Sequence, residues 1–135
     1  MIDLKLDSID NELIEKAREV RRMSYSPYSG FAVGAAVYDE KLGFFTGTNV
    51  ENSSYGMTVC AERIAVFKAI SEGAKDIRKI AIIADDVSFV SPCGACRQVI
   101  FEFGDEIEVI MTNLKGDIKK TYIKDLLPFG FRLKK

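Results

Sequence analysis

The sequence predicts an α/β fold, in the form of a single-domain three-layer α-β-α sandwich with a mixed sheet of about five strands. Its 135 residues are the usual length of one domain, so residues 1–135 are expected to form it. Helix and strand patterns follow one another in the order α-β-β-α-β-α-β-β. The strand–helix–strand order of the second half predicts a parallel pair of strands joined by a right-handed crossover.

The first half of the chain predicts one helix and one hairpin. Residues 10–23 carry apolar side chains at helical spacing, and charged residues fill the other face. Turn-forming residues at 26–30 end this helix. Residues 31–38 are apolar or small on both faces and predict a buried strand. After a turn at residues 39–43, residues 44–50 predict its hairpin partner.

The second half predicts helices that alternate with strands. Residues 60–72 form a strong helix pattern, which Gly73 ends, and few of its positions are polar. Such a helix is buried on most sides, which suggests contact with a partner subunit as well as with the sheet. The later patterns predict a strand at 79–84, a helix at 92–103, strands at 107–112 and 117–122, and a short helical turn at 125–127.

Charge and hydropathy argue against two classes of partner. The formal net charge is -1 and the basic residues are scattered among acids, so no basic face for nucleic acid is expected. No apolar run reaches the roughly 18 residues of a membrane span. The first residues alternate acidic and apolar side chains, unlike a signal peptide. We therefore expect a cytoplasmic protein that binds neither nucleic acid nor membrane.

Cysteine content makes a metal site the main functional prediction, because the chain has three cysteines and no histidine. Cys93 and Cys96 lie three residues apart at the start of a predicted helix, with Ser91 as its N-cap and Pro92 at its first position. A helix N-terminus favours negative charge and lowers the pKa of a thiol. Cys60 also begins a predicted helix, so three thiolates could surround one metal ion.

This ligand set is typical of a catalytic zinc site. A structural zinc has four protein ligands, and the chain has neither a fourth cysteine nor a histidine to offer. Water would fill the open position, where zinc lowers its pKa to about 7. Two plainer interpretations are a redox pair formed by the Cys-x-x-Cys segment and a simple packing role for Cys60.

Two charged residues stand close behind Cys60. Glu62 is the candidate acid–base residue, although an acid in a first helical turn also interacts favourably with the helix dipole. Positions i and i+2 of a helix do not face each other, so Cys60 must lie at or beside the cap if both residues serve one site. Arg63 would moderate the negative charge of the thiolates, unless it is an ordinary surface arginine.

Three residues at or just beyond the ends of the predicted hairpin are candidates for ligand contacts. Asn49 and Glu51 alternate along a strand end, so both side chains point to one side. An amide and a carboxylate together can bind sugar hydroxyls, whereas either residue alone would suggest ordinary turn polarity. Phe31 stands at the start of the first strand, where an aromatic side chain would ordinarily pack in the core.

Five segments match motifs of one known family. They are residues 25–36, Asn49-Val50-Glu51-Asn52, Cys60-Ala61-Glu62-Arg63, Pro92-Cys93-Gly94-Ala95-Cys96-Arg97-Gln98, and Leu126-Leu127-Pro128 followed by Phe131. Together they cover most of the chain, and their joint occurrence is far more specific than a Cys-x-x-Cys pair. In these segments the chain resembles the cytidine deaminase family, of the small homotetrameric zinc-dependent type.

The resemblance implies hydrolytic deamination of cytidine and deoxycytidine to uridine and deoxyuridine plus ammonia, in pyrimidine salvage. One Zn²⁺ per chain would be held by Cys60, Cys93 and Cys96, and its hydroxide would attack C4 of the base. Glu62 would carry the proton of the water to N3 and later to the leaving amino group.

The resemblance also implies how the substrate, a small-molecule nucleoside, is bound. Phe31, Asn49, Glu51 and the backbone of Ala61 would contact it. Phe131 would reach into the active site of a neighbouring subunit, so the homotetramer would have shared active sites.

Three alternatives remain at this point. A deaminase of a modified nucleoside antibiotic has similar metal motifs, although the pair of Asn49 and Glu51 favours an ordinary ribonucleoside. A polynucleotide-editing deaminase would need a basic face. A non-catalytic zinc or redox module would bind metal without turnover, and an activity test separates it.

Overall fold

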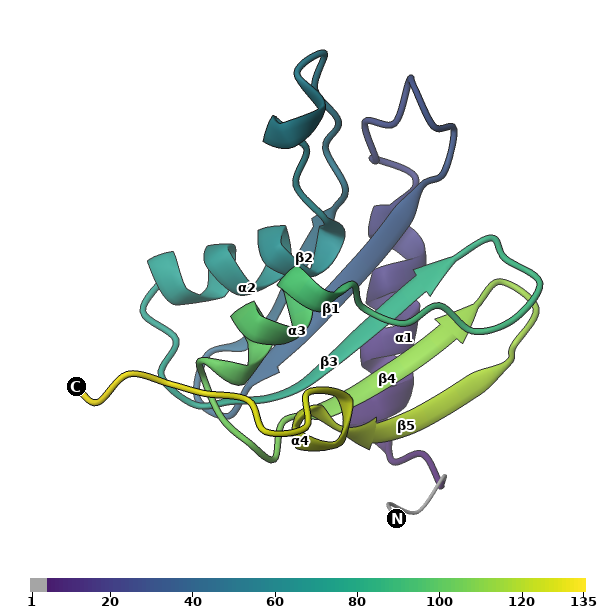
Figure 1. The fold of residues 1–135 in the computed structure, drawn as a ribbon. Helices are drawn as coiled ribbons and strands as arrows, with labels where there is room; N and C mark the ends of the chain where they lie inside the picture. Colours follow the sequence, from purple (N-terminus) through teal and green to yellow (C-terminus); the bar gives the residue numbers. More distant parts are fainter. Residues whose placement is uncertain (1–4) are drawn as a thin grey trace.

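The computed structural model describes residues 5–135, which form one five-stranded mixed sheet with helices on both faces (Figure 1). The strand order is β2-β1-β3-β4-β5. The β3 and β4 strands run parallel, and the other neighbouring pairs are antiparallel. The strands are β1 Val33–Asp39, β2 Gly43–Thr48, β3 Ile77–Ala84, β4 Glu108–Asn113 and β5 Ile118–Tyr122. The predicted three-layer fold, with its hairpin and its parallel pair, is confirmed.

Helices divide unequally between the two faces of the sheet. One face is covered by α1, and the other by α2, α3 and α4 (Figure 1). The helices are α1 Ser8–Arg21, α2 Ala61–Ser71, α3 Gly94–Phe101 and α4 Ile123–Leu126, and a short 3-10 helix, η1 Tyr55–Met57, precedes α2. No helix within residues 5–135 combines the length and the apolar character needed to cross a membrane.

The α1 helix is fixed at its first turn by charged side chains. Asp7 accepts a hydrogen bond from the backbone of Asp10, and the Asp10 carboxylate accepts one from the backbone of Asp7, which makes a reciprocal capping box. The buried Asp10 carboxylate also accepts hydrogen bonds of 2.7 Å from the ammonium groups of Lys79 and Lys120. These pairs join α1 to β3 and β5 and compensate the buried charge.

Two glycines let helices on opposite faces approach the sheet closely. A Cβ atom on Gly34 of β1 would lie 2.1 Å from the carbonyl oxygen of Ala17 in α1. A Cβ atom on Gly47 of β2 would lie 2.5 Å from the backbone nitrogen of Ala65 in α2. Real Cβ atoms do not come so close, so these positions require glycine, and the second one sets the distance between β2 and the helix that carries the site.

Several element bounds differ from the sequence-based predictions for local reasons. The first helix begins at Ser8 rather than at residue 10, because Asp7 is its cap. The hairpin strands begin at Val33 and end at Thr48, rather than spanning residues 31–50. Beyond these strands, the Asn49 side chain adds hydrogen bonds to the backbone of Val33 and Phe31.

Candidate functional site

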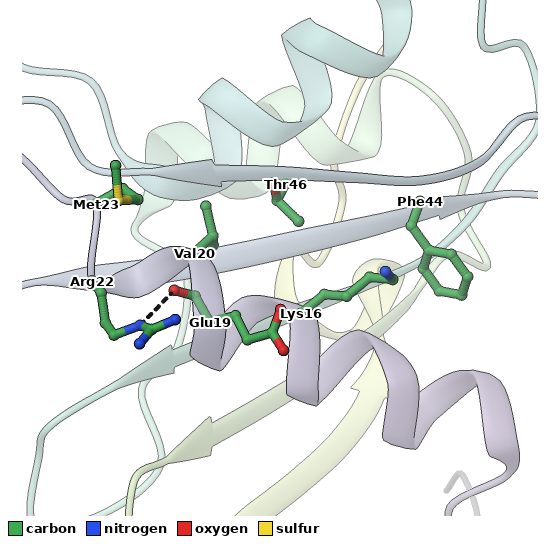
Figure 2. Close-up of a pocket in the computed structure, with 7 residues that line it drawn as sticks. All are labelled: Lys16, Glu19, Val20, Arg22, Met23, Phe44 and Thr46. Carbon is green, nitrogen blue, oxygen red and sulfur yellow. Dashed lines mark hydrogen bonds between the residues drawn. The ribbon is translucent and has the colours of Figure 1, made fainter.

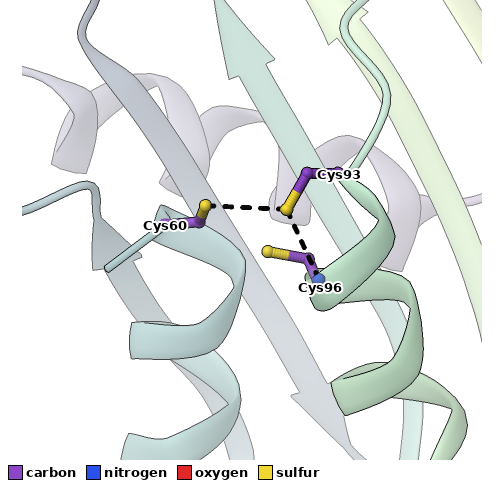
Figure 3. Close-up of side chains that lie close together, drawn as sticks. All are labelled: Cys60, Cys93 and Cys96. Atoms are coloured by element: carbon purple, nitrogen blue, oxygen red, sulfur yellow. Dashed lines mark hydrogen bonds between the residues drawn. The ribbon is translucent and has the colours of Figure 1, made fainter. Parts of the chain in front are cut away.

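Three thiols meet where α2 and α3 begin (Figure 3). Cys60 is the N-cap of α2, Cys93 is the N-cap of α3, and Cys96 lies in the first turn of α3. Their Sγ atoms all lie within 4.8 Å of one another, and those of Cys60 and Cys93 are 3.8 Å apart. The fold therefore brings together thiols from two helices that start far apart in the sequence.

The geometry and chemistry of this cluster fit zinc. Two sulfurs bound to one tetrahedral zinc at about 2.3 Å each are themselves about 3.8 Å apart, which matches the Cys60–Cys93 separation. In the part of the chain that the structure describes, this is the one group of three or more cysteine and acidic side chains placed to hold a metal ion. Three protein donors leave one coordination position open, as in catalytic zinc sites.

The N-cap of α3 differs from the prediction. Ser91 is not the N-cap and Pro92 is not the first helical residue, because α3 begins at Gly94. Cys93 itself is the cap, and its Sγ accepts a hydrogen bond of 3.5 Å from the backbone N–H of Cys96. Sulfur at a cap position lies beside the unpaired N–H groups of the first turn, which favour a thiolate there.

The same cap position explains how Cys60 and Glu62 share a site. Cys60 has an extended backbone, with φ of -73° and ψ of 155°, and the helix begins at the next residue. The expectation that Cys60 lies at the cap is confirmed. Glu62 then stands in the first helical turn and lines the same cavity as Cys60.

The thiol cluster favours a first thiolate at Cys60. Its pKa is lowered to about 5, chiefly by a hydrogen bond from the Cys96 thiol and further by Arg63, which together outweigh burial. The pKa of Cys96 is raised, because its thiol donates that hydrogen bond and is buried. Binding of a divalent cation would lower the pKa of all three thiols, since the thiolate is the form that binds metal.

Glu62 is buried beside the thiols, with 5% of its surface exposed. Burial raises the pKa of its carboxyl group to about 7. A group whose pKa lies near neutrality can both take up and release a proton at physiological pH. The position and the pKa of Glu62 therefore suit acid–base chemistry, and its burial exceeds what a simple helix-dipole acid requires.

Arg63 contacts the cluster from the first turn of α2. Its Nη2 donates to the Sγ of Cys60 across 3.6 Å. This hydrogen bond raises the pKa of the guanidinium group. The Arg63 Nε is buried without a partner among the described residues. Arg63 is half-buried and in contact with the thiol cluster, unlike an ordinary surface arginine.

A cavity of about 290 Å³ opens beside Cys60 and Cys93. Its size is close to the lower limit for small-molecule pockets. Of the predicted site residues, Phe31, Asn49, Glu51, Cys60, Ala61, Glu62 and Cys93 line it, together with Ser29, Val33, Thr58, Ile82, Val90 and Ser91. Sequence-predicted residues from four separate segments thus face one space. Asn49 and Glu51 both line it, as expected, although their strand ends at Thr48.

The Asn49 side chain is held in one orientation by three groups of the surrounding backbone and side chains. Its Oδ1 accepts hydrogen bonds from Ser24 Oγ at 2.5 Å and from Val33 N at 3.0 Å. Its Nδ2 donates to the carbonyl oxygen of Phe31 at 2.8 Å. Both lone pairs of Oδ1 are then occupied, so the amide has one N–H left to offer a ligand.

Glu51 is fixed in a similar way from the turn before β1. Its Oε1 accepts hydrogen bonds from the backbone N–H groups of Tyr28 at 2.9 Å and Ser29 at 3.2 Å. The Ser29 hydroxyl donates to Oε2. The Ser29 hydrogen bond, with the backbone contacts, lowers the pKa of the carboxyl group. A carboxylate accepts about four hydrogen bonds, so one acceptor position remains, on Oε2.

Phe131 does not line the cavity of its own chain, and 66% of its surface is exposed. Its backbone is nevertheless held, because Gln98 Nε2 donates to the Phe131 carbonyl oxygen at 3.2 Å. Arg97 donates to the carbonyl oxygens of Pro92 at 2.8 Å and Leu126 at 2.9 Å. Arg97 and Gln98 were part of a recognised motif without an assigned role, and the structure shows that they anchor the C-terminal segment.

A larger hollow of about 680 Å³ lies on the other side of the sheet, between α1 and β2 (Figure 2). Its lining includes Lys16, whose ammonium group lies 5.2 Å from the centre of the Phe44 ring. Its Arg22 donates to the carbonyl oxygen of Glu19, at 3.4 Å. The lining holds no thiol and no buried acid, so we place the chemistry at the thiol cavity instead.

Comparisons with known proteins agree with the geometry of the thiol cavity. Residues 7–112 match the family model for the cytidine and deoxycytidylate deaminase zinc-binding region. Cytidine deaminase of Sporosarcina psychrophila is 50% identical over 121 residues, which are 89% of this chain and 89% of that protein. The crystal structure of cytidine deaminase from Burkholderia pseudomallei has a TM-score of 0.87 and 44% identity, and covers 90% of this chain and 98% of that one.

A deaminase of a nucleoside antibiotic is less similar to the chain than the two cytidine deaminases just named. Blasticidin-S deaminase of Bacillus cereus is 33% identical over 130 residues, which are 90% of this chain and 91% of that protein. The lower identity gives the antibiotic-deaminase alternative no advantage over deamination of cytidine.

Proposed function

Because the chain belongs to the cytidine and deoxycytidylate deaminase family and is a hydrolytic deaminase that acts on cytidine, we propose that it also accepts deoxycytidine and uses Glu62 as its proton shuttle. The products are uridine or deoxyuridine and ammonia, as in pyrimidine salvage. One observation carries the proposal: Glu62 is buried, with its pKa raised to about 7, in the same cavity as a three-thiol cluster that fits zinc.

Cys60, Cys93 and Cys96 are the proposed ligands of one zinc ion per chain, which would act as a Lewis acid and activate water for attack on C4 of the base. Ionised Glu62 takes a proton from this water and delivers it to N3. The second proton of the same water passes through Glu62 to the amino nitrogen, which leaves as ammonia. Arg63 supports this chemistry by holding Cys60 and offsetting the charge of the thiolates.

The sugar of the nucleoside is proposed to bind between Asn49 and Glu51. Asn49 offers one remaining N–H and Glu51 one remaining acceptor position. A hydroxyl group accepts and donates at the same time, so a single sugar hydroxyl can satisfy both residues. Phe31, which also lines the cavity, would pack on the base, and the backbone of Ala61 would contact the polar edge of the base.

A homotetramer with shared active sites is the proposed assembly. Phe131 has an anchored backbone but an exposed ring, which suits a side chain that reaches into a neighbouring subunit. Phe67 on the outer side of α2 is 49% exposed, so this helix also has an apolar face available to a partner. A cytoplasmic location is proposed because all three cysteines are free thiols, which a reducing compartment preserves.

The test of this function is direct. Purified zinc-loaded protein is incubated with cytidine and with deoxycytidine, and the ultraviolet change on conversion to the uridine products is followed. The same protein after chelation serves as the control, and activity should return when zinc is restored. A metal-binding module without catalysis would leave both nucleosides unchanged.

A further inference from the structure

Ser29 stands in the turn before β1, and its hydroxyl contacts two residues of the proposed nucleoside site. We propose that Ser29 is a positioning residue that sets the preference for substrates with sugar hydroxyls by holding the Glu51 carboxylate. The proposal rests on the proposed role of Glu51 in sugar binding. The turn pattern in the sequence does not indicate this role, because serine is common in turns.

The two oxygens of the Glu51 carboxylate are held by different groups. Backbone N–H groups of Tyr28 and Ser29 hold Oε1, which alone would leave the carboxylate free to turn about that oxygen. Rotation about the terminal bond of a glutamate has no sharp minimum, so a second contact is needed to fix the plane. The Ser29 hydroxyl supplies it at Oε2, the oxygen with the remaining acceptor position.

The same hydroxyl also contacts Phe31, the residue proposed to pack on the base. Ser29 Oγ accepts a hydrogen bond of 3.0 Å from the backbone N–H of Phe31 while it donates to Glu51. One serine thus links the residue proposed to bind the sugar with the residue proposed to pack on the base. Both hydrogen bonds are exposed, so water can replace them and their loss costs little stability. The effect of Ser29 should therefore appear in substrate choice rather than in folding.

The experiment compares kcat/KM for cytidine, deoxycytidine and 2′,3′-dideoxycytidine. From the first to the last, these nucleosides carry progressively fewer sugar hydroxyls. In the wild-type protein, kcat/KM should drop sharply between the substrate that carries the hydroxyl bound by Glu51 and the substrate that lacks it. In Ser29→Ala this drop in kcat/KM should shrink about threefold to tenfold, which corresponds to the usual net contribution of one hydrogen bond. The change should lie mainly in KM, and zinc content and thermal unfolding should stay at wild-type values.

A matched pair of variants separates the hydroxyl from the packing. Thr and Val have nearly the same shape, so Ser29→Thr should keep the wild-type drop and Ser29→Val should lose it as Ser29→Ala does. This pair also keeps the proposal testable if Ser29→Ala folds poorly. Ser53→Ala is the control for the surrounding loops, because Ser53 bonds to the Tyr28 hydroxyl and not to Glu51.

The outcomes distinguish the role of Ser29 from the role of Glu51. If wild-type protein shows the drop and Ser29→Ala and Ser29→Val keep it unchanged, the role of Ser29 is refuted while the sugar-binding role of Glu51 survives. If wild-type protein deaminates all three substrates equally well, the proposed role of Glu51 fails and the role of Ser29 fails with it. Equal losses for every substrate would indicate a general structural effect and would also refute the positioning role.

Discussion

Replacing Glu62 by glutamine isolates its proton chemistry from its packing. Glutamine has almost the same shape as glutamate, and it stays neutral in a position where only 5% of the side chain surface is exposed. We therefore expect Glu62→Gln to fold, to bind zinc and to show no loss of stability, because it removes a carboxyl group that burial disfavours in its charged form.

The expected loss of activity is large because every proton in the proposed reaction passes through this one carboxyl group. A positioned acid–base group is typically worth about 10²–10⁴ in rate. Two successive transfers depend on Glu62, so we expect kcat to fall by about 10³ or more, which is about 4 kcal/mol of transition-state stabilisation.

The assay is the deamination of cytidine, measured at saturating substrate, with zinc content determined on the same sample. Glu62→Asp is the matched control, because it keeps a carboxyl group but shortens its reach, and we expect it to retain more activity than the amide. A fully zinc-loaded Glu62→Gln protein with kcat within tenfold of the wild type would remove Glu62 from the mechanism.

Four further predictions concern the metal, the sugar site, the assembly and the response to acid. Elemental analysis should find about one zinc per chain, and absent zinc with three freely titratable thiols would contradict the metal site. Asn49→Ala and Glu51→Ala should each lower kcat/KM for cytidine at least about tenfold, and free cytosine should be a very poor substrate for the wild type. Phe131→Ala should raise KM about threefold to tenfold, and mixing these chains with Glu62→Gln chains should restore some sites with wild-type KM; mixed tetramers without recovery would refute shared sites. Burial opposes ionisation of Asp39, but backbone N–H groups around it outweigh burial and lower its pKa, so its stabilising effect is present above the unfolded value and is lost as the pH falls through the lower folded value. Urea unfolding at pH 7 and pH 3 should show a smaller loss of stability on acidification for Asp39→Asn.

Local patterns in the sequence were sufficient for the elements and the metal site, but not for the contacts that orient the substrate residues. Cys60, Cys93 and Cys96 were predictable because their residue type and their positions at helix starts carry the chemistry. The exact start of α3 was predicted wrongly because proline is common at a first helical position. In the structure, the thiol of Cys93 caps the helix, which begins at Gly94.

Contacts between residues far apart in the sequence could not be predicted from local patterns. Ser24 reaches Asn49 across 25 positions, and Ser29 reaches Glu51 across 22 positions. Serine in a turn has many ordinary roles, so neither residue could be assigned from its neighbours. Gln98 and Phe131 are 33 positions apart, and their hydrogen bond likewise depends on how the C-terminal segment returns to α3.

The position of the thiols at two helix starts has a mechanical consequence. Cys60 and Cys93 are separated by 33 positions, and the intervening chain contains α2 and the central strand β3. A metal ion bound to both residues closes this stretch into a loop and acts as a cross-link. By the loop-closure relation used for disulfides, a cross-link of this span restricts the unfolded chain by roughly 3–4 kcal/mol. Loss of the metal would therefore remove a tie between the two helices as well as the catalytic centre, and the enzyme would lose thermal resistance and activity together.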